Sequence, residues 1–441
     1  MAKPFAVEGG IVSFPRYERY KDSDVAWLGE VPEHWRIYPL KHIVSTPITD
    51  GPHETPNFLD EGIPFVSAEA VASGSINFKK IRGFISEADH TRYSQKYRPQ
   101  IGDIYMVKSG ATTGITAIVE TIDDFNIWSP LAAIRCGNLA TPRFILNFMR
   151  SRNFQEAVTL NWSFGTQQNI GMGVIENLVV TLPPVEEQQT ISTFLDRETA
   201  KIDELIAEQQ RFIELLKEKR QAVISHAVTK GLNPDAPMKD SGIEWLGEVP
   251  VHWIVGPVKY FFTILDGCRI PLSSEERSYK QGNFPYYGAS GIIDSIDDYI
   301  FDEDLVLVSE DGANLINRAT PIAFVARGRY WVNNHAHILK PVDKYLDYWT
   351  QRIEAVDLVP FITGSAQPKL TIEALTNLVI AVPPSENERG QIEQFVVMQN
   401  MLSNNLIAEA QRAIELLKER RTTLISAAVT GKIDVRGLVA D

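Results

Sequence analysis

Glycine-rich polar loops carry the side chains of this sequence that are best suited to binding a ligand. Residues 108–114 read KSGATTG and offer a cation, hydroxyl groups and backbone amides. In the second half, residues 309–318 read SEDGANLINR and add side-chain amides and a guanidinium. Such groups bind phosphates, and in the major groove asparagine or glutamine pairs with adenine and arginine with guanine. We therefore interpret both loops as candidate nucleic-acid contacts, with ordinary turns as the alternative.

A short glycine-to-glutamine turn occurs at the same place in both halves. It reads GTQQ at 165–168 and GSAQ at 364–367, and each time it precedes a strand-like run and a Pro-Pro pair. Basic residues also gather at 79–82 and at 92–98, where a plain solvated face is the alternative interpretation. The candidate DNA-contacting residues are Lys79, Lys80, Arg82, Lys108, Ser109, Thr112, Thr113, Thr166, Gln167, Gln168, Asn314, Asn317, Arg318, Gln367 and Lys369.

Catalytic motifs are missing from the sequence. There is no Gly-x-x-x-x-Gly-Lys-Ser/Thr phosphate loop and no Asn/Asp-Pro-Pro-Tyr motif of the kind found in amino-methyltransferases. His335 and His337 alternate on an expected strand, but no further ligands accompany them, so packing or hydrogen bonding is the preferred interpretation over metal binding. Cys136 and Cys268 lie far apart and are interpreted as reduced thiols. We expect neither a catalytic residue nor a metal site on this chain.

Two long helices must position these loops. Residues 205–229 and 406–430 are nearly identical, and a Pro-Pro pair precedes each segment. Each helix has room for roughly 40 residues, or about 60 Å. The expected apolar faces are Leu205, Phe212, Leu216, Val223 and Ala227 in the first helix, and Leu406, Ala413, Leu417, Leu424 and Ala428 in the second. We predict that the helices pair as an antiparallel coiled coil, rather than being two unrelated surface helices.

Globular segments precede each helix. The expected strands are 104–107, 116–119, 131–134 and 178–182 in the first segment, and 305–308, 322–325, 337–339 and 378–382 in the second; the expected helices are 142–160 and 345–355. The organisation is an N-terminal arm (1–24), a first globular domain (25–182), a central helix (183–232), a linker (233–244), a second globular domain (245–382) and a C-terminal helix (383–441). The fold class is therefore α/β with an internal repeat, whose junctions are alike and whose centres differ.

The length, the net charge and the lack of long apolar segments limit the classes of function that the chain can have. A chain of 441 residues has room for about two to four domains. Its formal net charge of -13 argues against nonspecific coating of nucleic acid, so any contact with nucleic acid must be local. There is no secretory leader and no apolar run long enough to span a bilayer, and we expect a cytoplasmic protein that does not enter membranes.

The repeated motifs resemble the specificity subunit of type I restriction-modification systems. They are WLGEVPEHW at 27–35 and WLGEVPVHW at 245–253, the Gly-Thr/Ser-x-Gln turns, and the Pro-Pro helix starts whose helices end in ISHAVT and ISAAVT. The resemblance covers nearly the whole chain. It implies two target-recognition domains held apart by antiparallel helices, each domain reading one half of a bipartite site in double-stranded DNA.

The same resemblance implies partners. The helices would act as a ruler and hold two adenine methyltransferase (M) subunits, and restriction (R) subunits would join. S-adenosylmethionine, ATP and Mg would belong to those partners, and the chain itself would be non-catalytic. One departure concerns the second helix start, which lacks the Glu187-Gln188 pair of the first. Two rival functions remain: a standalone DNA-binding or structural scaffold, and a fused methyltransferase or nuclease.

Overall fold

The computed structural model describes residues 7–8, 11–12, 14–164, 168–364 and 367–438, and the chain forms two compact units. The first unit contains residues 1–209 and 412–441, and the second contains residues 210–411. Both boundaries fall inside the long helices α6 (Val185–Lys230) and α11 (Glu386–Val429), so each unit contains part of both helices. Among the described residues, no helix has the length and apolar character needed to cross a membrane.

The first unit combines short strands with small helices. Its strands are β1 (Val7–Glu8), β2 (Ile11–Val12), β3 (Tyr20–Asp22), β4 (Glu30–Pro32), β5 (Arg36–Pro39), β6 (Thr49–Asp50), β7 (Ile63–Val66), β8 (Gly83–Ile85), β9 (Ile104–Val107), β10 (Thr116–Ile118), β11 (Asn126–Ile127), β12 (Leu131–Ile134), β13 (Ser163–Phe164), β14 (Gln168–Asn169) and β15 (Val179–Leu182). Its smaller helices are α1 (Ala68–Val71), α2 (Glu87–Ser94), α3 (Pro142–Met149), α4 (Arg152–Leu160) and α5 (Met172–Asn177), with 3-10 turns η1 (Leu40–His42) and η2 (Phe78–Lys80).

The second unit has the same kinds of elements. Its strands are β16 (Met238–Asp240), β17 (Glu248–Pro250), β18 (Ile254–Pro257), β19 (Phe262–Ile264), β20 (Gln281–Gly288), β21 (Gly291–Ile296), β22 (Phe301–Asp302), β23 (Leu305–Ser309), β24 (Ala323–Ala326), β25 (Arg329–Val332), β26 (Ala336–Pro341), β27 (Ile362–Thr363), β28 (Lys369–Leu370) and β29 (Val379–Val382). Its smaller helices are α7 (Ser274–Tyr279), α8 (Asn314–Asn317), α9 (Leu346–Glu354) and α10 (Ile372–Asn377), with 3-10 turns η3 (Val258–Tyr260), η4 (Asp266–Cys268) and η5 (Val359–Phe361).

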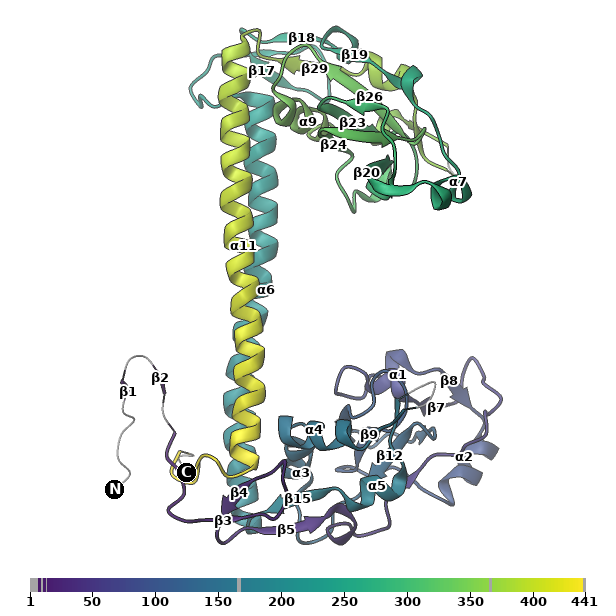
Figure 1. Cartoon of the computed structure of the whole chain (residues 1–441), viewed down its shortest axis with the longest axis vertical. Coiled ribbons are helices and arrows are strands. Elements are labelled where there is room, and N and C mark those ends of the chain that lie inside the picture. The colour runs from purple at the N-terminus through teal and green to yellow at the C-terminus, as the bar shows by residue number, and fades with distance from the viewer. Residues whose placement is uncertain (1–6, 9–10, 13, 165–167, 365–366, 439–441) are drawn as a thin grey trace. The chain divides into compact units, whose positions relative to one another are not determined.

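A common frame recurs in the two units (Figure 1). The four-stranded sheet of the first unit has the order β10-β9-β12-β6, and that of the second has the matching order β24-β23-β26-β19. The strand before each long helix pairs antiparallel with the strand after each entry motif, as β15 with β5 and β29 with β18. These pairings confirm the predicted internal repeat and the α/β class.

The outer sheets differ. The first unit adds a three-stranded sheet of order β11-β7-β8, whereas the second adds a four-stranded sheet of order β21-β20-β25-β22. Each outer sheet contains one parallel pair, β11 with β7 and β20 with β25. The frame is therefore repeated and the centres differ, as the sequence predicts.

The helices pack antiparallel inside each unit, but the predicted apolar faces were partly wrong. Leu205, Phe212 and Leu406 are 45%, 43% and 42% exposed. The last three predicted residues of each helix do face the other helix, whereas the first two move one residue later, to Ile206 and Ile213 in α6 and to Ile407 and Ile414 in α11. The positions of this seam are buried or half-buried. They form a heptad series of Ile202, Ile206, Gln209, Ile213, Leu216, Arg220, Val223 and Ala227 in α6, and Ser403, Ile407, Ala410, Ile414, Leu417, Arg421, Leu424 and Ala428 in α11.

Polar residues in this series pair with the other helix. In the first unit Arg421 donates to Asp203 at 2.8 Å, and in the second unit Arg220 donates to Asn404 at 3.0 Å. Apolar residues repeating every 3.5 positions keep one narrow seam of a helix facing its partner. The antiparallel coiled coil is confirmed, with the seam shifted by one residue at the first two predicted positions of each helix.

Three further expectations needed correction. The single helix predicted over 142–160 is broken into α3 and α4, because Ser151 accepts a hydrogen bond from Phe154 N and starts a second helix. The predicted loop 309–318 contains the short helix α8. Residues 14–24 of the predicted arm belong to the first unit, since Tyr17 is buried and β3 pairs with β4.

Candidate nucleic-acid interface

The two candidate loops of the first unit meet. Gly110 N donates to Gln168 O at 3.0 Å, and Ile170 N donates to Lys108 O at 2.9 Å. Ser109 also forms an isolated bridge with Asn169, at the end of the β13–β14 hairpin. Backbone bonds thus join the loop after β9 to Gln168 and the two residues that follow it, which puts them on one surface.

The second unit repeats this junction. Gly312 N donates to Pro368 O at 3.0 Å, and Leu370 N donates to Glu310 O at 2.8 Å. Asp311 bridges to Lys369 in the β27–β28 hairpin. Gly110 and Gly312 both have a φ of +99°, a conformation that strongly favours glycine. The loop after the central strand is therefore held by its hairpin in the same way in both units.

The hydroxyls of the first loop have different environments. Thr113 is buried, and its Oγ1 donates to Gly110 O at 2.8 Å, which closes the turn. Ser109 and Thr112 are half-buried, and Gln168 is half-buried beside them. The loop thus has one hydroxyl that stabilises it and two whose side chains keep part of their surface accessible.

Lys108 forms an ion pair with a carboxylate at the base of the loop. Its Nζ is 2.7 Å from Asp50 Oδ2, and Lys96 Nζ is 2.6 Å from Asp50 Oδ1. His53 Nε2 lies 3.1 Å from the same carboxylate. Burial opposes ionisation of Asp50, but the bonds from both lysines outweigh it and hold the pKa of Asp50 below its ordinary value. Lys108 therefore anchors the loop to β6.

A charged cluster lies at the base of the second unit's loop. His337 Nδ1 is 2.6 Å from Asp266 Oδ2, and its Nε2 is 2.8 Å from Leu370 O. Arg269 and Lys369 both pair with Glu310. Burial raises the pKa of the Asp266 and Glu310 carboxyls, yet their hydrogen bonds prevail and lower both pKa values.

Asp266, Glu310 and His337 are close enough to share a metal ion. However, both ring nitrogens of His337 already have hydrogen-bond partners within the chain, Nε2 in the Leu370 carbonyl at 2.8 Å and Nδ1 in the Asp266 carboxylate at 2.6 Å. In addition, Arg269 and Lys369 neutralise Glu310. We interpret the cluster as a network that fixes the loop to its hairpin.

The amide and guanidinium groups of loop 309–318 differ in accessibility. Asn314 makes reciprocal bonds with the Thr320 backbone at 3.0 and 2.9 Å. Arg318 pairs with Glu354 at 2.7 Å. Asn317 and Gln367 are exposed. In this loop region the accessible amides are thus Asn317 and Gln367.

The basic group at 79–82 belongs to other elements of the first unit. Lys79 and Lys80 are exposed on η2. The Arg82 guanidinium lies 5.0 Å above the Trp128 ring and 3.7 Å from Glu69. Thr166 and Gln167 lie outside the described residues. The structure therefore joins the candidates 108–113 with Gln168 and places the basic group next to the variable outer sheet.

A buried carboxylate at the start of α6 was not predicted. Glu187 Oε1 accepts bonds from Tyr17 at 2.7 Å and from the Trp35 indole at 3.1 Å, and Oε2 lies 2.8 Å from His34 Nε2. Burial first and the Glu187 bond second raise the pKa of Tyr17. The repeated tryptophans were the available sequence signal, although they did not identify their acceptor.

The second unit has the same carboxylate in Glu388. It accepts a bond from the Trp253 indole at 3.0 Å and lies 2.9 Å from His252 Nε2. Next to it, Arg389 donates to the Pro383 carbonyl and to Asp343, whereas in the first unit Gln188 donates to the Pro183 carbonyl and accepts from Thr141 N. Glu388 therefore takes the place of Glu187 although the second helix start lacks the Glu-Gln pair, and Arg389 in place of Gln188 makes a different second set of contacts.

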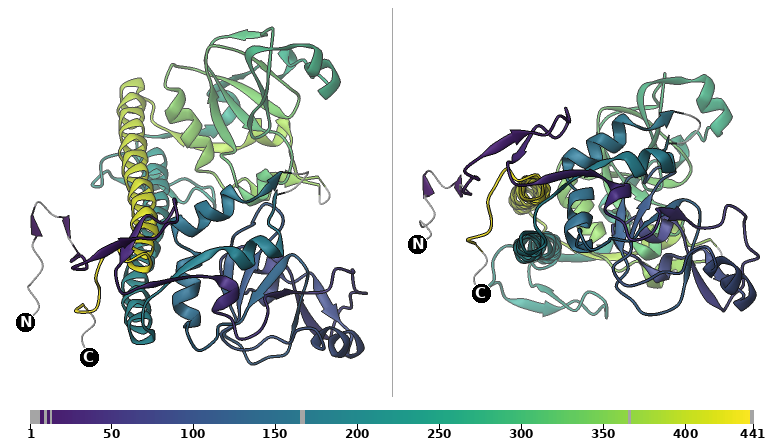
Figure 2. Two further views of the ribbon diagram at one scale, coloured as in Figure 1. Left: turned by 60° about the horizontal axis from the view of Figure 1, so that its bottom comes forward. Right: turned by 90° about the horizontal axis from the view of Figure 1, so that it is seen from below.

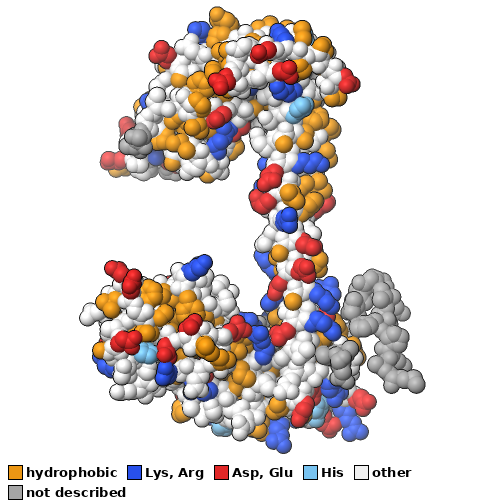
Figure 3. All heavy atoms as spheres, turned by 180° about the vertical axis from the view of Figure 1, so that it is seen from behind, with side chains coloured by type: hydrophobic (Ala, Val, Ile, Leu, Met, Phe, Trp, Pro, Cys, Tyr) orange, Lys and Arg blue, Asp and Glu red, His pale blue; other side chains and the backbone are white. Residues whose placement is uncertain are grey.

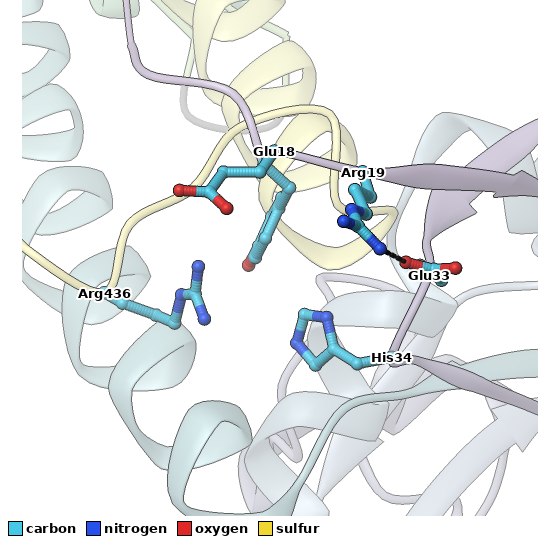
Figure 4. A pocket seen from close by; sticks show the side chains of 6 residues that line it. Glu18, Arg19, Glu33, His34 and Arg436 are labelled. Carbon is cyan, nitrogen blue, oxygen red and sulfur yellow. Dashed lines mark ion pairs between the residues drawn. The ribbon is translucent and has the colours of Figure 1, made fainter.

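A hollow of about 450 Å³ opens beside Glu187 in the first unit (Figure 4). Its lining residues are Tyr17, Glu18, Arg19, Glu33, His34 and Arg436. Both of its arginines have acidic partners, since Arg19 lies 3.7 Å from Glu33 and Arg436 donates to Asp434 at 2.6 Å. Asp434 N also donates to Pro15 O, so the first and last segments of the chain lie together here (Figure 2). We interpret this hollow as part of a structural junction.

Comparison with known proteins gives consistent results. Residues 32–215 and 250–417 match the family model for the type I restriction modification DNA specificity domain. A Methanocaldococcus jannaschii protein, provisionally assigned as the type I restriction enzyme MjaX specificity subunit, is 25% identical over 452 residues, which are 97% of this chain and 99% of that protein. The EcoKI specificity subunit of Escherichia coli is 24% identical over 261 residues, which are 58% of this chain and 53% of that protein.

One solved structure shares the fold. It comes from work on complex assembly and conformational transition of the type I R-M system and superposes with a TM-score of 0.59. The match covers 90% of this chain and 98% of the other, at 16% sequence identity. At this identity the likeness concerns the fold alone.

Proposed function

The chain belongs to the type I restriction modification DNA specificity family, the family of type I specificity subunits, and on that premise we propose that each unit reads one half of a bipartite, gapped DNA site. The observation that supports this most is the repeated frame with dissimilar centres. Both units hold the same pair of loops together by backbone bonds, but their outer sheets have different strand numbers and orders. Two different DNA-contacting domains built on the same framework are suited to an asymmetric DNA target with two half-sites.

We assign the candidate side chains to two groups. Lys79, Lys80 and Arg82 contact phosphates in the first unit, because they are cationic and lie on exposed elements beside the variable sheet. The accessible polar side chains read base edges. These readers are Ser109, Thr112 and Gln168 in the first unit, and Asn317 and Gln367 in the second. Thr166 and Gln167, next to Gln168 in sequence, belong to the same proposed group.

The remaining candidates support the loops. Lys108 is anchored by Asp50, Thr113 closes its turn, and Asn314 ties two parts of its loop together. Arg318 and Lys369 pair with Glu354 and Glu310. These side chains act on DNA affinity through the position of the loop, with direct contact as a second role for the exposed Lys369.

The helices have their own proposed role. We propose that α6 and α11 fix the distance between the half-sites and hold two methyltransferase subunits, with restriction subunits joining that core. S-adenosylmethionine, ATP and Mg would then bind to those partners. Figure 3 shows hydrophobic side chains among the charged ones along the helices. Leu205, Leu215 and Leu416 are exposed apolar residues of α6 and α11. Exposed apolar positions on a packed helical pair favour a further protein contact.

A domain exchange tests the proposal that each domain determines one half-site independently of the other. Residues 36–182 would be replaced by the corresponding region of another family member, and the methylated sequence would be determined in cells that express the matching methyltransferase. We expect one half-site to change and the other to remain. The reciprocal exchange of residues 254–382 is the matched control and should change only the other half. A change in both half-sites, or in neither, would contradict the proposal.

A further inference from the structure

The two long helices differ sharply over one stretch of nine residues. Residues 397–405 of α11 read VMQNMLSNN and carry no charge. The matching residues of α6, 196–204, read DRETAKIDE and carry six charged side chains. The helices are otherwise similar on both sides of this stretch, with Ile191 and Phe194 matching Ile392 and Phe395. The internal symmetry of the chain is therefore broken at a defined place on its helical frame.

The apolar residues of this stretch lie on the outside of α11 in the second unit. Val397, Met398, Met401 and Leu402 are 39%, 50%, 62% and 51% exposed, whereas Val396 and Ser403 are buried. Positions 398 and 402, and likewise 397 and 401, are four residues apart, so the four side chains are neighbours on the helix surface. They form an apolar ridge about 9 Å long on a helix.

The matching surface in the first unit is charged, and its side chains make polar contacts within the chain. Arg197 donates to Leu438 O of the C-terminal segment at 3.0 Å, and Asp196 lies 3.5 Å from Arg143 of α3. Lys201 pairs with Glu198 at 2.9 Å. The side chains of Asp196, Arg197 and Lys201 are 53%, 45% and 61% exposed, so the ridge and its counterpart are similarly exposed and differ in being apolar and charged. The charged surface of the first unit is well solvated, whereas the apolar ridge of the second unit favours contact with another protein.

We infer that the ridge of Val397, Met398, Met401 and Leu402 gives the second unit a stronger contact with its methyltransferase subunit than the first unit has. This inference rests on the proposed function. Four residues are a small fraction of the roughly 20–30 residues per side of a stable interface, so the ridge cannot by itself hold a second copy of this chain. It can extend a contact that the helical frame already provides, and it does so at one end only.

The shape of the ridge defines what covers it. A narrow line of side chains on a helix accepts the apolar face of another helix, whose residues recur every three to four positions. Methionine adapts to irregular apolar partners because its side chain is unbranched and polarisable. The occupant is therefore an amphipathic helix of the methyltransferase, and assembly proceeds through a complex with one methyltransferase on the second unit.

Titration of the purified chain with the methyltransferase subunit tests this order of assembly. Native mass spectrometry should show a 1:1 complex before the 2:1 complex, with the first dissociation constant lower by roughly tenfold or more. The variant carrying Met398→Arg and Leu402→Lys, which copies Arg197 and Lys201, should weaken the first step until both steps are alike. Ile122→Lys, at an 86% exposed apolar position in the first unit, is the matched control and should leave both steps unchanged.

A gain of affinity separates the inference from simple misfolding. The reciprocal variant with Ala200→Met and Lys201→Leu should strengthen the second step. Equal affinities for both steps in the wild-type chain, with no effect of either variant, would overturn the inference and leave the proposed function intact. If the wild-type chain formed a homodimer and the ridge variant did not, the inference would also be overturned, because the ridge would then mediate self-association. Failure of the wild-type chain to bind any methyltransferase would instead contradict the proposed function.

Discussion

The indole nitrogen of Trp35 donates a 3.1 Å hydrogen bond to Oε1 of Glu187, and this bond joins the entry hairpin to the first turn of α6. The same relationship recurs in the second unit between Trp253 and Glu388 at 3.0 Å. In both units a histidine just before the tryptophan contacts the same carboxylate. The direction in which each helix leaves its globular body therefore depends on a glutamate that the tryptophan motif alone does not reveal.

Substituting the two glutamates should have unequal effects. The Glu187 side chain is 7% exposed and also accepts a bond from Tyr17, whereas the Glu388 side chain is 27% exposed. Glu187→Ala leaves buried donors without an acceptor and should lower the local free energy of unfolding by about 2–3 kcal/mol, against about 1 kcal/mol for Glu388→Ala. Hydrogen exchange of peptides covering β5 and β18 measures both losses. Equal losses would contradict the importance of burial and of the Tyr17 bond.

Asp50 should make the first unit's loop sensitive to acid. Its pKa is held below the ordinary value of 3.8, so its stabilising effect is complete above that value and is lost as pH falls through the lower pKa of the folded state. Between about pH 5 and about pH 7, roughly one unit or more above its ordinary pKa, Asp50 stays ionised. The contribution of Asp50 to the protection of residues 104–114 from hydrogen exchange should therefore be constant over this range. Protection should decrease only below about pH 4.

The Asp50→Asn variant supplies the comparison for this pH dependence. It should lower loop protection at neutral pH by about 1–3 kcal/mol, because Lys96 and Lys108 lose an ionised acceptor. Its residual acid sensitivity should be smaller than that of the wild-type chain. If wild type and variant lost protection over the same acidic range and to the same extent, another carboxyl group would have to be responsible.

The two cysteines should react at very different rates. Burial raises the pKa of the Cys136 thiol to about 12, whereas Cys268 is exposed. Because the thiolate is the reactive form, a maleimide should label Cys268 quickly near neutral pH and Cys136 only after unfolding. Mass spectrometry of peptides from the labelled chain measures both rates, with Cys268→Ser as the control. Rapid labelling of Cys136 in the folded chain would show that its surroundings open readily.

The proposed DNA contacts separate into two experimental classes. Lys79→Ala with Lys80→Ala should weaken binding of the assembled complex to all DNA sequences and reduce the slope of log affinity against log salt by about 0.9 for each phosphate that the variant no longer neutralises. Gln367→Ala should instead relax sequence preference in one half-site. Lys41→Ala, whose side chain bonds Asn177, is the basic control and should leave the salt slope unchanged. A specificity change caused by the lysine variant would contradict this assignment.

Much of the frame was predictable because its signals are local. The apolar runs at 104–107 and 131–134 became the buried strands β9 and β12, and the Pro-Pro pairs preceded α6 and α11 as expected. The repeat of the WLGEVP motif likewise predicted two equivalent bodies. The strand order and the contact between each loop and its hairpin required the structure, since both depend on residues distant in sequence.

The errors have specific physical causes. In α6, the apolar Leu205 is followed directly by the apolar Ile206, and Phe212 by Ile213. The hydrophobic pattern alone therefore did not show which residue of each pair faces the other helix. Pairing with the other helix made that choice, because the seam follows a 3.5-residue repeat. At the second helix start, one extra residue separates the Pro-Pro pair from Glu388, and that shift concealed its equivalence with Glu187.

The proposed role of this chain is to select the DNA sequence at which a methyltransferase acts. A genome-wide map of adenine methylation tests it, in a methylation-deficient host that expresses the chain together with its methyltransferase. We expect one gapped, bipartite motif that disappears when the chain is omitted. Methylation that persists unchanged without the chain, or its absence despite a stable complex with the methyltransferase, would contradict this role.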